Sequence, residues 1–374
     1  VPVRENEWDN RHFWRVSNAE HLAMSEDCGI VNLSHFAMFD VEGPDHEALM
    51  EWLCAAKVGG DANIGKGIYT HFLDDEGMVR ADFTIFRMAD RIRLVDGADA
   101  GMRDLHYVRR TAQDKGMNVT VTDVTAKFVT IGIWGPNARI TLQKVVEDPN
   151  GLTPENFPFA AIKPIKIAGK NVTAFRISYV GEQGWELHMK YEDGLAVWDA
   201  LRSTGVMPFG VETYANSRRM EKSLRLQNAD LLTEYNLIEA DLARPKVKEA
   251  DFRGKAKHLE YEARPNQPAM LCTLVMTENT DSKGVARYPV GIMPVMDPAT
   301  GETLADSLGR RSFTTSVVYG PTIGKNIALA YLPWDYCQEG RKLIVEYFGE
   351  TYPVEVVSIG YKPLYDPENL KPRT

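Results

Sequence analysis

The stretch Gly77–Arg87 reads GMVRADFTIFR and follows the acidic turn LDDEG. Its apolar residues alternate with Arg80, Asp82 and Thr84, and this period of two predicts a β-strand. Asp82 then lies on the face opposite the apolar row. If protein covers both faces, this carboxylate is buried and needs a partner or a chemical role. The alternative is a solvated aspartate on a half-buried strand, because most strand carboxylates face water.

Composition limits the classes of protein that this chain can represent. The 374 residues are 44% hydrophobic and 25% charged, which is an ordinary globular composition with length for two or three domains. The formal net charge of -9 argues against a nucleic-acid partner, which would require a basic surface. No run of 18 apolar residues occurs, so we expect no membrane partner.

Several common site motifs do not occur in the sequence. The four cysteines form no CxxC pair and the histidines form no HExxH pair, so no bound metal is expected. Neither GxGxxG after a strand nor a Walker A motif is found, which leaves a nucleotide site unsupported. Scattered thiols indicate a reducing compartment, so we predict a cytoplasmic protein. The first residues, VPVRENEWDN, lack Met and a secretory apolar segment, and the chain is expected to begin inside a longer protein.

Periodicity along the chain predicts mixed helix and sheet. Apolar residues at helical spacing predict helices at 45–57, 101–116, 194–205 and 213–226. Three strands are expected within 67–95, two within 118–134 and a hairpin within 163–180. After the turn-rich RPNQP near residue 265, short strands with Gly and Pro turns predict a small β-barrel or sandwich. We therefore predict an α+β protein with regions 1–264 and 265–374.

Six segments, in order along the chain, resemble one family. The stretch Tyr179–His188, YVGEQGWELH, has the pattern Y-x-G-E-x-G-aromatic-E and is similar to the signature of the glycine cleavage T-protein family of tetrahydrofolate-dependent aminomethyltransferases. Five further segments resemble that family: NLSHF (32–36), GPNAR (135–139), SRRMEK (217–222), FRGK (252–255) and SVVYGPTIGKNIALA (316–330).

This resemblance implies a three-lobed fold with a central folate cavity. Residues 1–264 would form two intertwined α+β lobes, and residues 265–374 would form a C-terminal β-barrel that closes the cavity through the connection at Gly320, Pro321 and Gly324. The implied cofactor is tetrahydrofolate, which would accept a one-carbon unit from a small methylated donor.

The segment around Asp82 favours one branch of the family. Where the T-protein carries two adjacent aspartates, this chain has Ala81 and Asp82, which is similar to the folate domain of dimethylglycine and sarcosine dehydrogenases and to folate-dependent demethylases. Those dehydrogenases carry a flavin domain, so the resemblance implies a flavoprotein partner for this chain. The sequence leaves the donor open among N-, S- and O-methyl compounds, and leaves 5-methyl and 5,10-methylene products open.

Two other functions are considered. The chain could be a non-catalytic folate-binding subunit of a flavin-dependent amine demethylase complex. A folate-binding regulator of iron–sulfur assembly would carry a K-G-C-[FY]-x-G-Q-E stretch, which this sequence lacks.

The resemblance also implies site residues. Glu182 can accept two N–H bonds from a pterin, although it could instead cap a strand end. Arg219 offers a planar fork for a ligand carboxylate or carbonyl, although a surface ion pair with Glu221 or Glu212 is the alternative.

Asp82 is the candidate for the reacting centre and His35 is expected to face the same cavity, unless it is a core histidine. Four aromatic residues are candidates to stack on the folate ring, although each taken alone is more often a core residue: Tyr69, Tyr179, Trp185 and Tyr319.

Overall fold

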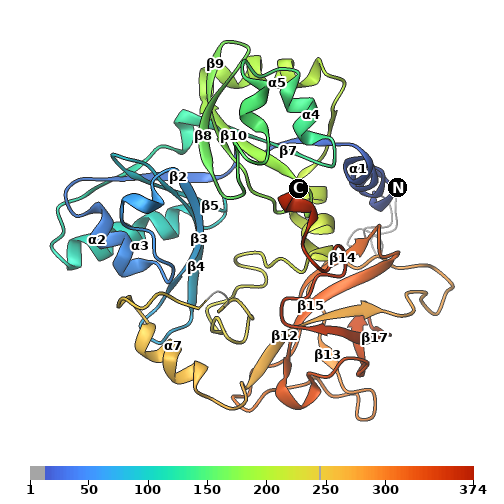
Figure 1. Ribbon diagram of the computed structural model, residues 1–374. Coiled ribbons are helices and arrows are strands. Elements are labelled where there is room, and N and C mark those ends of the chain that lie inside the picture. Colours follow the sequence, from blue (N-terminus) through green and yellow to red (C-terminus); the bar gives the residue numbers. More distant parts are fainter. Residues whose placement is uncertain (1–12, 244–245) are drawn as a thin grey trace.

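The computed structural model describes residues 13–243 and 246–374. Three sheets form three lobes, coloured blue, green and orange-red in Figure 1. Helix α1 (Trp14–Glu26) lies beside the green lobe, on the right of that view. This mixed helix and sheet architecture confirms the predicted α+β class.

The first lobe is a five-stranded antiparallel sheet whose order is β3–β4–β5–β2–β6. Helices α2 (His46–Leu53) and α3 (Gly101–Asp114) pack on one face of it, where Leu53 and Val108 join the strands in one core. The strands are β2 (Ala37–Glu42), β3 (Lys66–Leu73), β4 (Val79–Arg87), β5 (Ile92–Asp96) and β6 (Thr120–Asp123).

Strand β4 has the alternation that its sequence predicts. Ala81, Phe83 and Ile85 are fully buried in the core beneath the two helices. Asp82 points to the other face, where α2 and α3 do not lie. Asp82 is half-buried in the described chain, and residues of the neighbouring lobes line the same cavity.

The second lobe is a six-stranded sheet with the order β11–β1–β7–β10–β9–β8, in which only the β1–β11 pair is parallel. Helices α4 (Ala138–Gln143) and α5 (Gly194–Arg202) cover one face through Leu142, Val197 and Leu201. The strands are β1 (Gly29–Asn32), β7 (Phe128–Trp134), β8 (Ile162–Ile167), β9 (Lys170–Phe175), β10 (Gly184–Lys190) and β11 (Met207–Pro208).

The helix expected at 213–226 is shorter than predicted. It comprises a π-helical segment, η7 (Thr213–Arg218), followed by α6 (Arg219–Glu221). Ser223 then has a φ of 56°, which lies in the left-handed region and ends the helix. The following residues are consequently free to leave the helix axis and line the central cavity.

The third lobe is a six-stranded antiparallel sheet with the order β13–β16–β17–β12–β15–β14. A bridge between Pro294 and Phe313 links its two edges, so the sheet nearly closes on itself as the predicted small barrel. The strands are β12 (Ala269–Met276), β13 (Val295–Met296), β14 (Thr314–Gly320), β15 (Lys325–Pro333), β16 (Lys342–Tyr347) and β17 (Glu350–Ile359).

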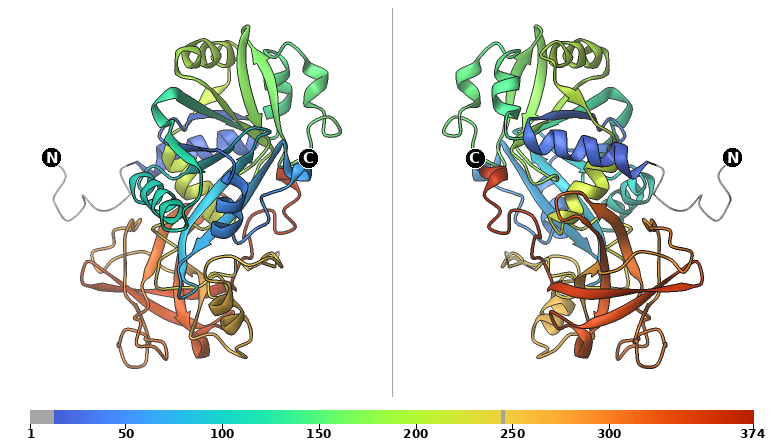
Figure 2. Two further views of the ribbon diagram at one scale, coloured as in Figure 1. Left: turned by 90° about the vertical axis from the view of Figure 1, so that its left-hand side faces the viewer. Right: turned by 90° about the vertical axis from the view of Figure 1, so that its right-hand side faces the viewer.

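The three lobes are tied together by segments that cross between them. Helix α7 (Lys255–Glu262) packs against the β3–β4 turn, where the Tyr261 hydroxyl donates to the Glu76 carbonyl at 2.8 Å. The C-terminus leaves the barrel and returns to the second lobe, where Arg139 donates to the Thr374 carbonyl at 2.7 Å (Figure 2). The boundary near residue 265 would fall between α7 and β12, and we retain it as a proposal.

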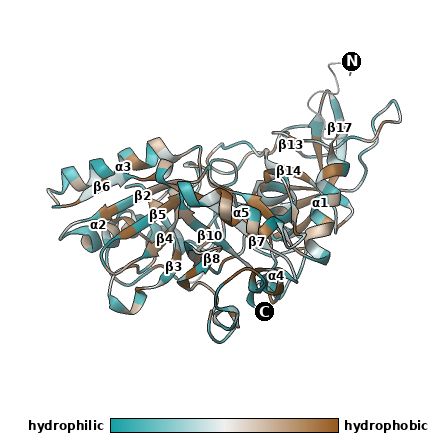
Figure 3. Cartoon of the chain, turned by 90° about the horizontal axis from the view of Figure 1, so that it is seen from above, coloured by the Kyte–Doolittle hydropathy of each residue, from teal (hydrophilic) through white to brown (hydrophobic). Residues whose placement is uncertain are grey.

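Figure 3 shows hydrophobic residues concentrated along the strands and polar residues on the connections. Among the described residues, we find no helix that combines the length and the hydrophobicity needed to cross a membrane. Short helical turns complete the fold: η3 (Asp61–Asn63), η4 (Thr125–Lys127), η5 (Pro149–Leu152), η6 (Tyr191–Asp193), η8 (Trp334–Tyr336) and η9 (Lys371–Arg373).

Candidate functional site

A cavity of about 450 Å³ lies where the three lobes meet. The first lobe contributes Tyr69 and Asp82, the second contributes Glu186, and Tyr361 reaches the cavity from the segment after β17 of the barrel. Aromatic rings and carboxylates together form much of its lining. Four of the residues expected at the site line this cavity: His35, Tyr69, Asp82 and Tyr179.

Asp82 is held by one strong hydrogen bond from the neighbouring strand. The hydroxyl of Tyr69 on β3 donates to Asp82 Oδ2 at 2.7 Å. Burial raises the pKa of Asp82 to about 6, and the negative charges of Asp104 and Asp99 add to this increase. The carboxyl is therefore largely ionised at pH 7 while remaining close enough to neutrality to exchange a proton.

His35 and Tyr179, the other two predicted residues that line the cavity, have different environments. Burial lowers the pKa of His35, which favours its neutral imidazole at pH 7. The Tyr179 hydroxyl donates to the Arg225 backbone carbonyl at 2.7 Å, and burial raises the pKa of this hydroxyl. Tyr179 therefore connects the second lobe to the segment that follows α6.

Glu182 does not line the cavity. Its side chain is 2% exposed, and Oε1 accepts from Arg218 Nη2 and from the Tyr365 hydroxyl, each at 2.7 Å. Gly181 beside it has a φ of 79°, and a Cβ there would meet the Lys222 side chain at 2.5 Å. Gly181 and Glu182 therefore contribute to packing and to a buried ion pair, and they do not contact the cavity.

The second glutamate of the same motif lies in the cavity instead. Strand β10 begins at Gly184, and alternation buries Trp185 and Leu187 in the second-lobe core. Glu186 falls on the opposite face, lines the cavity and contacts His188 Nε2 through Oε2 at 3.2 Å. Period-two alternation applied from Gly184 would have identified Glu186 from the sequence.

Three other predicted ligand-binding residues also lie outside the cavity lining. Trp185 is fully buried in the second-lobe core, so its ring has no free face for a ligand. Arg219 donates to Asp230 Oδ2 at 2.6 Å, rather than pairing with either glutamate considered from the sequence. Tyr319 on β14 packs against Trp14, with ring centroids 5.1 Å apart.

The connection from Gly320 to Gly324 also packs elsewhere. The backbone N–H of Thr322 donates to Glu221 Oε1 at 2.8 Å, so this connection fixes the barrel to α6. The barrel reaches the cavity through Tyr361 instead. We retain the proposal that this lobe closes the site, with Tyr361 rather than the Gly320–Gly324 connection making the contact.

Three buried polar side chains in the lining were not singled out from the sequence. Both carboxyl oxygens of Asp96, the Nη2 of Arg225 and both amide atoms of Gln227 have no hydrogen-bond partner among the described residues. Burial, with Asp104 and Asp82 nearby, raises the pKa of Asp96 to about 9. Asp96 ends the apolar strand β5 and could have been noted for that reason.

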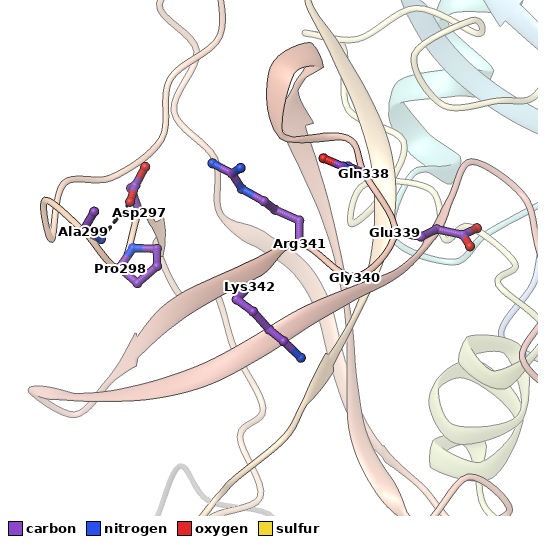
Figure 4. Close-up of a pocket in the computed structure, with 8 residues that line it drawn as sticks. All are labelled: Asp297, Pro298, Ala299, Gln338, Glu339, Gly340, Arg341 and Lys342. Atoms are coloured by element: carbon purple, nitrogen blue, oxygen red, sulfur yellow. Dashed lines mark hydrogen bonds between the residues drawn. The ribbon is translucent and has the colours of Figure 1, made fainter.

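A second hollow of about 490 Å³ lies on the barrel surface, far from these residues in sequence (Figure 4). In Figure 4 the Glu339 side chain extends away from Arg341, so the two do not form a joint site. Asp297 accepts from the Tyr336 hydroxyl at 2.7 Å and is already partnered. Within 13–243 and 246–374, no three His, Cys, Asp or Glu side chains are grouped to bind a metal.

Comparison with known proteins agrees with this architecture. A model of the GCVT N-terminal domain matches residues 3–246, and the glycine cleavage T-protein C-terminal barrel domain matches residues 289–366. The chain belongs to the glycine cleavage T-protein family. Within this family, the matched N-terminal domain contains Asp82 and Glu186, and the barrel domain contains Tyr361.

Two curated relatives are each 28% identical to this T-protein family chain. Mitochondrial dimethylglycine dehydrogenase of Rattus norvegicus aligns over 354 residues, 92% of this chain and 39% of its own length. The chain therefore spans about two-fifths of that relative. An aminomethyltransferase of Picosynechococcus sp. aligns over 365 residues, 96% of this chain and 92% of its own.

A solved structure shares the fold. The crystal structure of glycine cleavage system aminomethyltransferase T from Bartonella henselae matches with a TM-score of 0.74 at 22% identity, covering 93% of this chain and 90% of the other. The three-lobed arrangement is thus the fold of the family.

Proposed function

We propose that the protein transfers a one-carbon unit from a small methylated donor to tetrahydrofolate. The observation that carries this proposal is the Tyr69–Asp82 hydrogen bond inside a cavity lined by aromatic rings, in a chain of the T-protein family. The relatives named dimethylglycine dehydrogenase support a methylated amine as the donor and a flavoprotein as the partner that oxidises it. Four free cysteines are compatible with the proposed reducing cytoplasm.

The lining residues fit a folate in both shape and chemistry. Tyr69, Tyr179, Tyr214 and Tyr361 offer aromatic faces on several sides of the cavity. Glu186 offers carboxylate oxygens that can accept N–H bonds from a pterin, the role first given to Glu182. The partnerless polar atoms in the lining also support a polar ligand, because buried unpaired groups are costly.

Asp82 would provide the acid–base chemistry. Tetrahydrofolate, when bound, supplies the amine that receives the carbon. Asp82 can accept the proton that this amine releases, and Tyr69 keeps the carboxylate oriented through its hydrogen bond. With Ala81 beside it, no adjacent carboxylate on β4 can replace Asp82 in this task.

Two measurements test the proposal. Calorimetry measures the affinity for tetrahydrofolate, and mass spectrometry identifies the folate product formed with N-, S- and O-methyl donors, with formaldehyde as a preoxidised carbon. We expect binding and a one-carbon product. Folate binding without a product, even when a flavoprotein supplies the oxidised donor, would instead favour a non-catalytic folate-binding subunit.

A further inference from the structure

Two of the four cysteines lie side by side in the barrel. Cys272 lies on the interior strand β12, and Cys337 follows the helical turn η8. Their Sγ atoms are 3.8 Å apart, and the Cys272 thiol donates a weak hydrogen bond to the Cys337 sulfur. The other two cysteines belong to other lobes: Cys28 contacts Thr141 Oγ1 at 3.2 Å in the second lobe, and Cys54 ends α2 in the first.

The two sulfurs in the barrel are close enough to bond after a small movement. A disulfide bond is about 2.05 Å long, so the sulfurs must approach each other by roughly 1.8 Å. Strand β12 is paired on both sides, with β15 and β17, and this holds Cys272 in place. Cys337 lies in the connection between η8 and β16, outside the strands. The approach therefore moves this connection and leaves the sheet pairing unchanged.

The two thiols differ in their access to solvent. Cys272 is fully buried in the barrel core, whereas Cys337 is partly exposed. Gln338, the next residue along the chain, lines the surface hollow shown in Figure 4. A small oxidant from solvent therefore reaches Cys337 before it reaches Cys272.

The contact between the two thiols also favours ionisation of the outer one. The hydrogen bond from Cys272 lowers the pKa of Cys337, whereas the same contact and burial raise the pKa of Cys272. While protonated, Cys337 also donates to the Leu332 carbonyl at 3.3 Å, and this bond is lost on ionisation. Since the thiolate is the nucleophilic form of cysteine, Cys337 is the attacking sulfur and Cys272 is the thiol that follows.

We propose that Cys337 is a site of oxidation by hydrogen peroxide and that Cys272 resolves it into a reversible disulfide. The Cys337 thiolate attacks one peroxide oxygen, the O–O bond breaks, and Cys337 becomes a sulfenic acid as hydroxide leaves. The Cys272 thiol then loses its proton, and its sulfur displaces the sulfenic hydroxyl. Two thiols are oxidised to one disulfide, one peroxide is reduced, and two waters form. The disulfide protects Cys337 from irreversible oxidation, because a dithiol reductant restores both thiols.

Thiol counting and peptide mapping test this pair on the full chain. The reduced parent is treated with a small excess of hydrogen peroxide, denatured, alkylated with N-ethylmaleimide and digested without reductant for mass spectrometry. We expect the four free thiols to fall to two, with the Cys272 and Cys337 peptides joined by a disulfide that dithiothreitol removes. A non-reducing gel should show no covalent dimer.

Single variants assign the two roles. Cys337→Ser should leave Cys272 reduced after the same treatment, because the oxidant does not reach the buried thiol. Cys272→Ala removes the resolving thiol, so Cys337 should form a sulfenic acid that dimedone traps, and then a sulfinic acid that dithiothreitol does not reduce. Cys28→Ala, which removes a buried cysteine outside the barrel, is the matched control and should form the same disulfide as the parent.

Three results would overturn the proposal: four free thiols after treatment, a disulfide that joins two chains or includes Cys28 or Cys54, or irreversible oxidation of Cys337 in the parent while Cys272 stays reduced. The peptide map of the parent distinguishes these results by itself, so the test does not depend on the folding of any variant. Neither Cys272 nor Cys337 lines the central cavity, so the outcome is separate from that of the folate experiments.

Discussion

Two strands from different lobes, β4 and β10, each place an acidic residue in the cavity by the same alternation. On β4 the apolar row Ala81, Phe83 and Ile85 packs under helices, and Asp82 faces inward. On β10 the apolar row begins at Trp185, and Glu186 faces inward. Glu182, in the turn before β10, is partnered elsewhere. The comparison teaches that a conspicuous motif residue reaches a site only if the strand register directs it there.

The largest expected effect concerns the turn before β10. Glu182→Ala leaves Arg218 buried without its carboxylate, and breaking such a pair costs about 3–5 kcal/mol of folding free energy. Urea denaturation measures this loss. Glu155→Ala, which removes an exposed glutamate, should leave the stability close to that of the parent. If Glu182→Ala were stable but bound folate more weakly, the result would support the original hypothesis that Glu182 binds the ligand.

The next effect concerns β4. Asp82→Asn keeps the shape of the side chain but removes the proton acceptor, so turnover should fall by about 10²-fold or more with little change in folate affinity. Single-turnover kinetics measure this. Asp75→Asn, in the exposed turn before β4, serves as the control. A rate within a few-fold of the parent would make Asp82 a structural residue and direct attention to His35 or Tyr179.

The pH profile of the parent gives a further check on Asp82. Since its pKa is raised to about 6, the ionised form increases as the pH rises through 6. Single-turnover rates should therefore rise about tenfold per pH unit below pH 6 and level off above it. If the rate did not rise in this way, the reaction would not depend on the ionisation of Asp82.

A smaller effect is expected for β10. Glu186→Gln keeps an acceptor oxygen but removes the charge, which should weaken tetrahydrofolate binding by about 1–3 kcal/mol. Calorimetry compares this variant with Glu192→Gln, on the exposed surface just after β10. Unchanged binding in Glu186→Gln would contradict the equivalence of β4 and β10 as the two functional strands.

The last prediction is a dependence of stability on pH, and it concerns Asp96 at the end of β5. Its pKa is raised to about 9 in the folded state from an ordinary value of 3.8, so the folded protein holds the proton more tightly. As the pH rises from about 4 to about 9, this group should therefore lower the free energy of unfolding by up to about 1.4 kcal/mol per pH unit. Asp96→Asn should remove that slope, whereas Asp199→Asn, on exposed α5, should leave it. If stability depended on pH in the same way in Asp96→Asn and in the parent, the raised pKa of Asp96 in the folded protein would be contradicted.

The sequence by itself determined much of the fold and one half of the site. Alternation in GMVRADFTIFR placed Asp82 on the face opposite the core, and the ordered motifs specified the family and the barrel. These features are local, because side-chain direction in a strand repeats every two residues. Tyr69 and Tyr179 were also found as aromatic candidates, and both line the cavity.

Only the tertiary structure decided which polar residues are free to act. Glu182, Arg219 and Arg225 look equally available in the sequence, but long-range partners occupy the first two: Tyr365 contacts Glu182 and Ser316 contacts Arg219. Among the described residues, Arg225 has no anionic partner, because Ser223 ends the helix and the chain departs toward the cavity. Whether a buried charge is paired depends on segments far apart in the chain, and no local pattern records their approach.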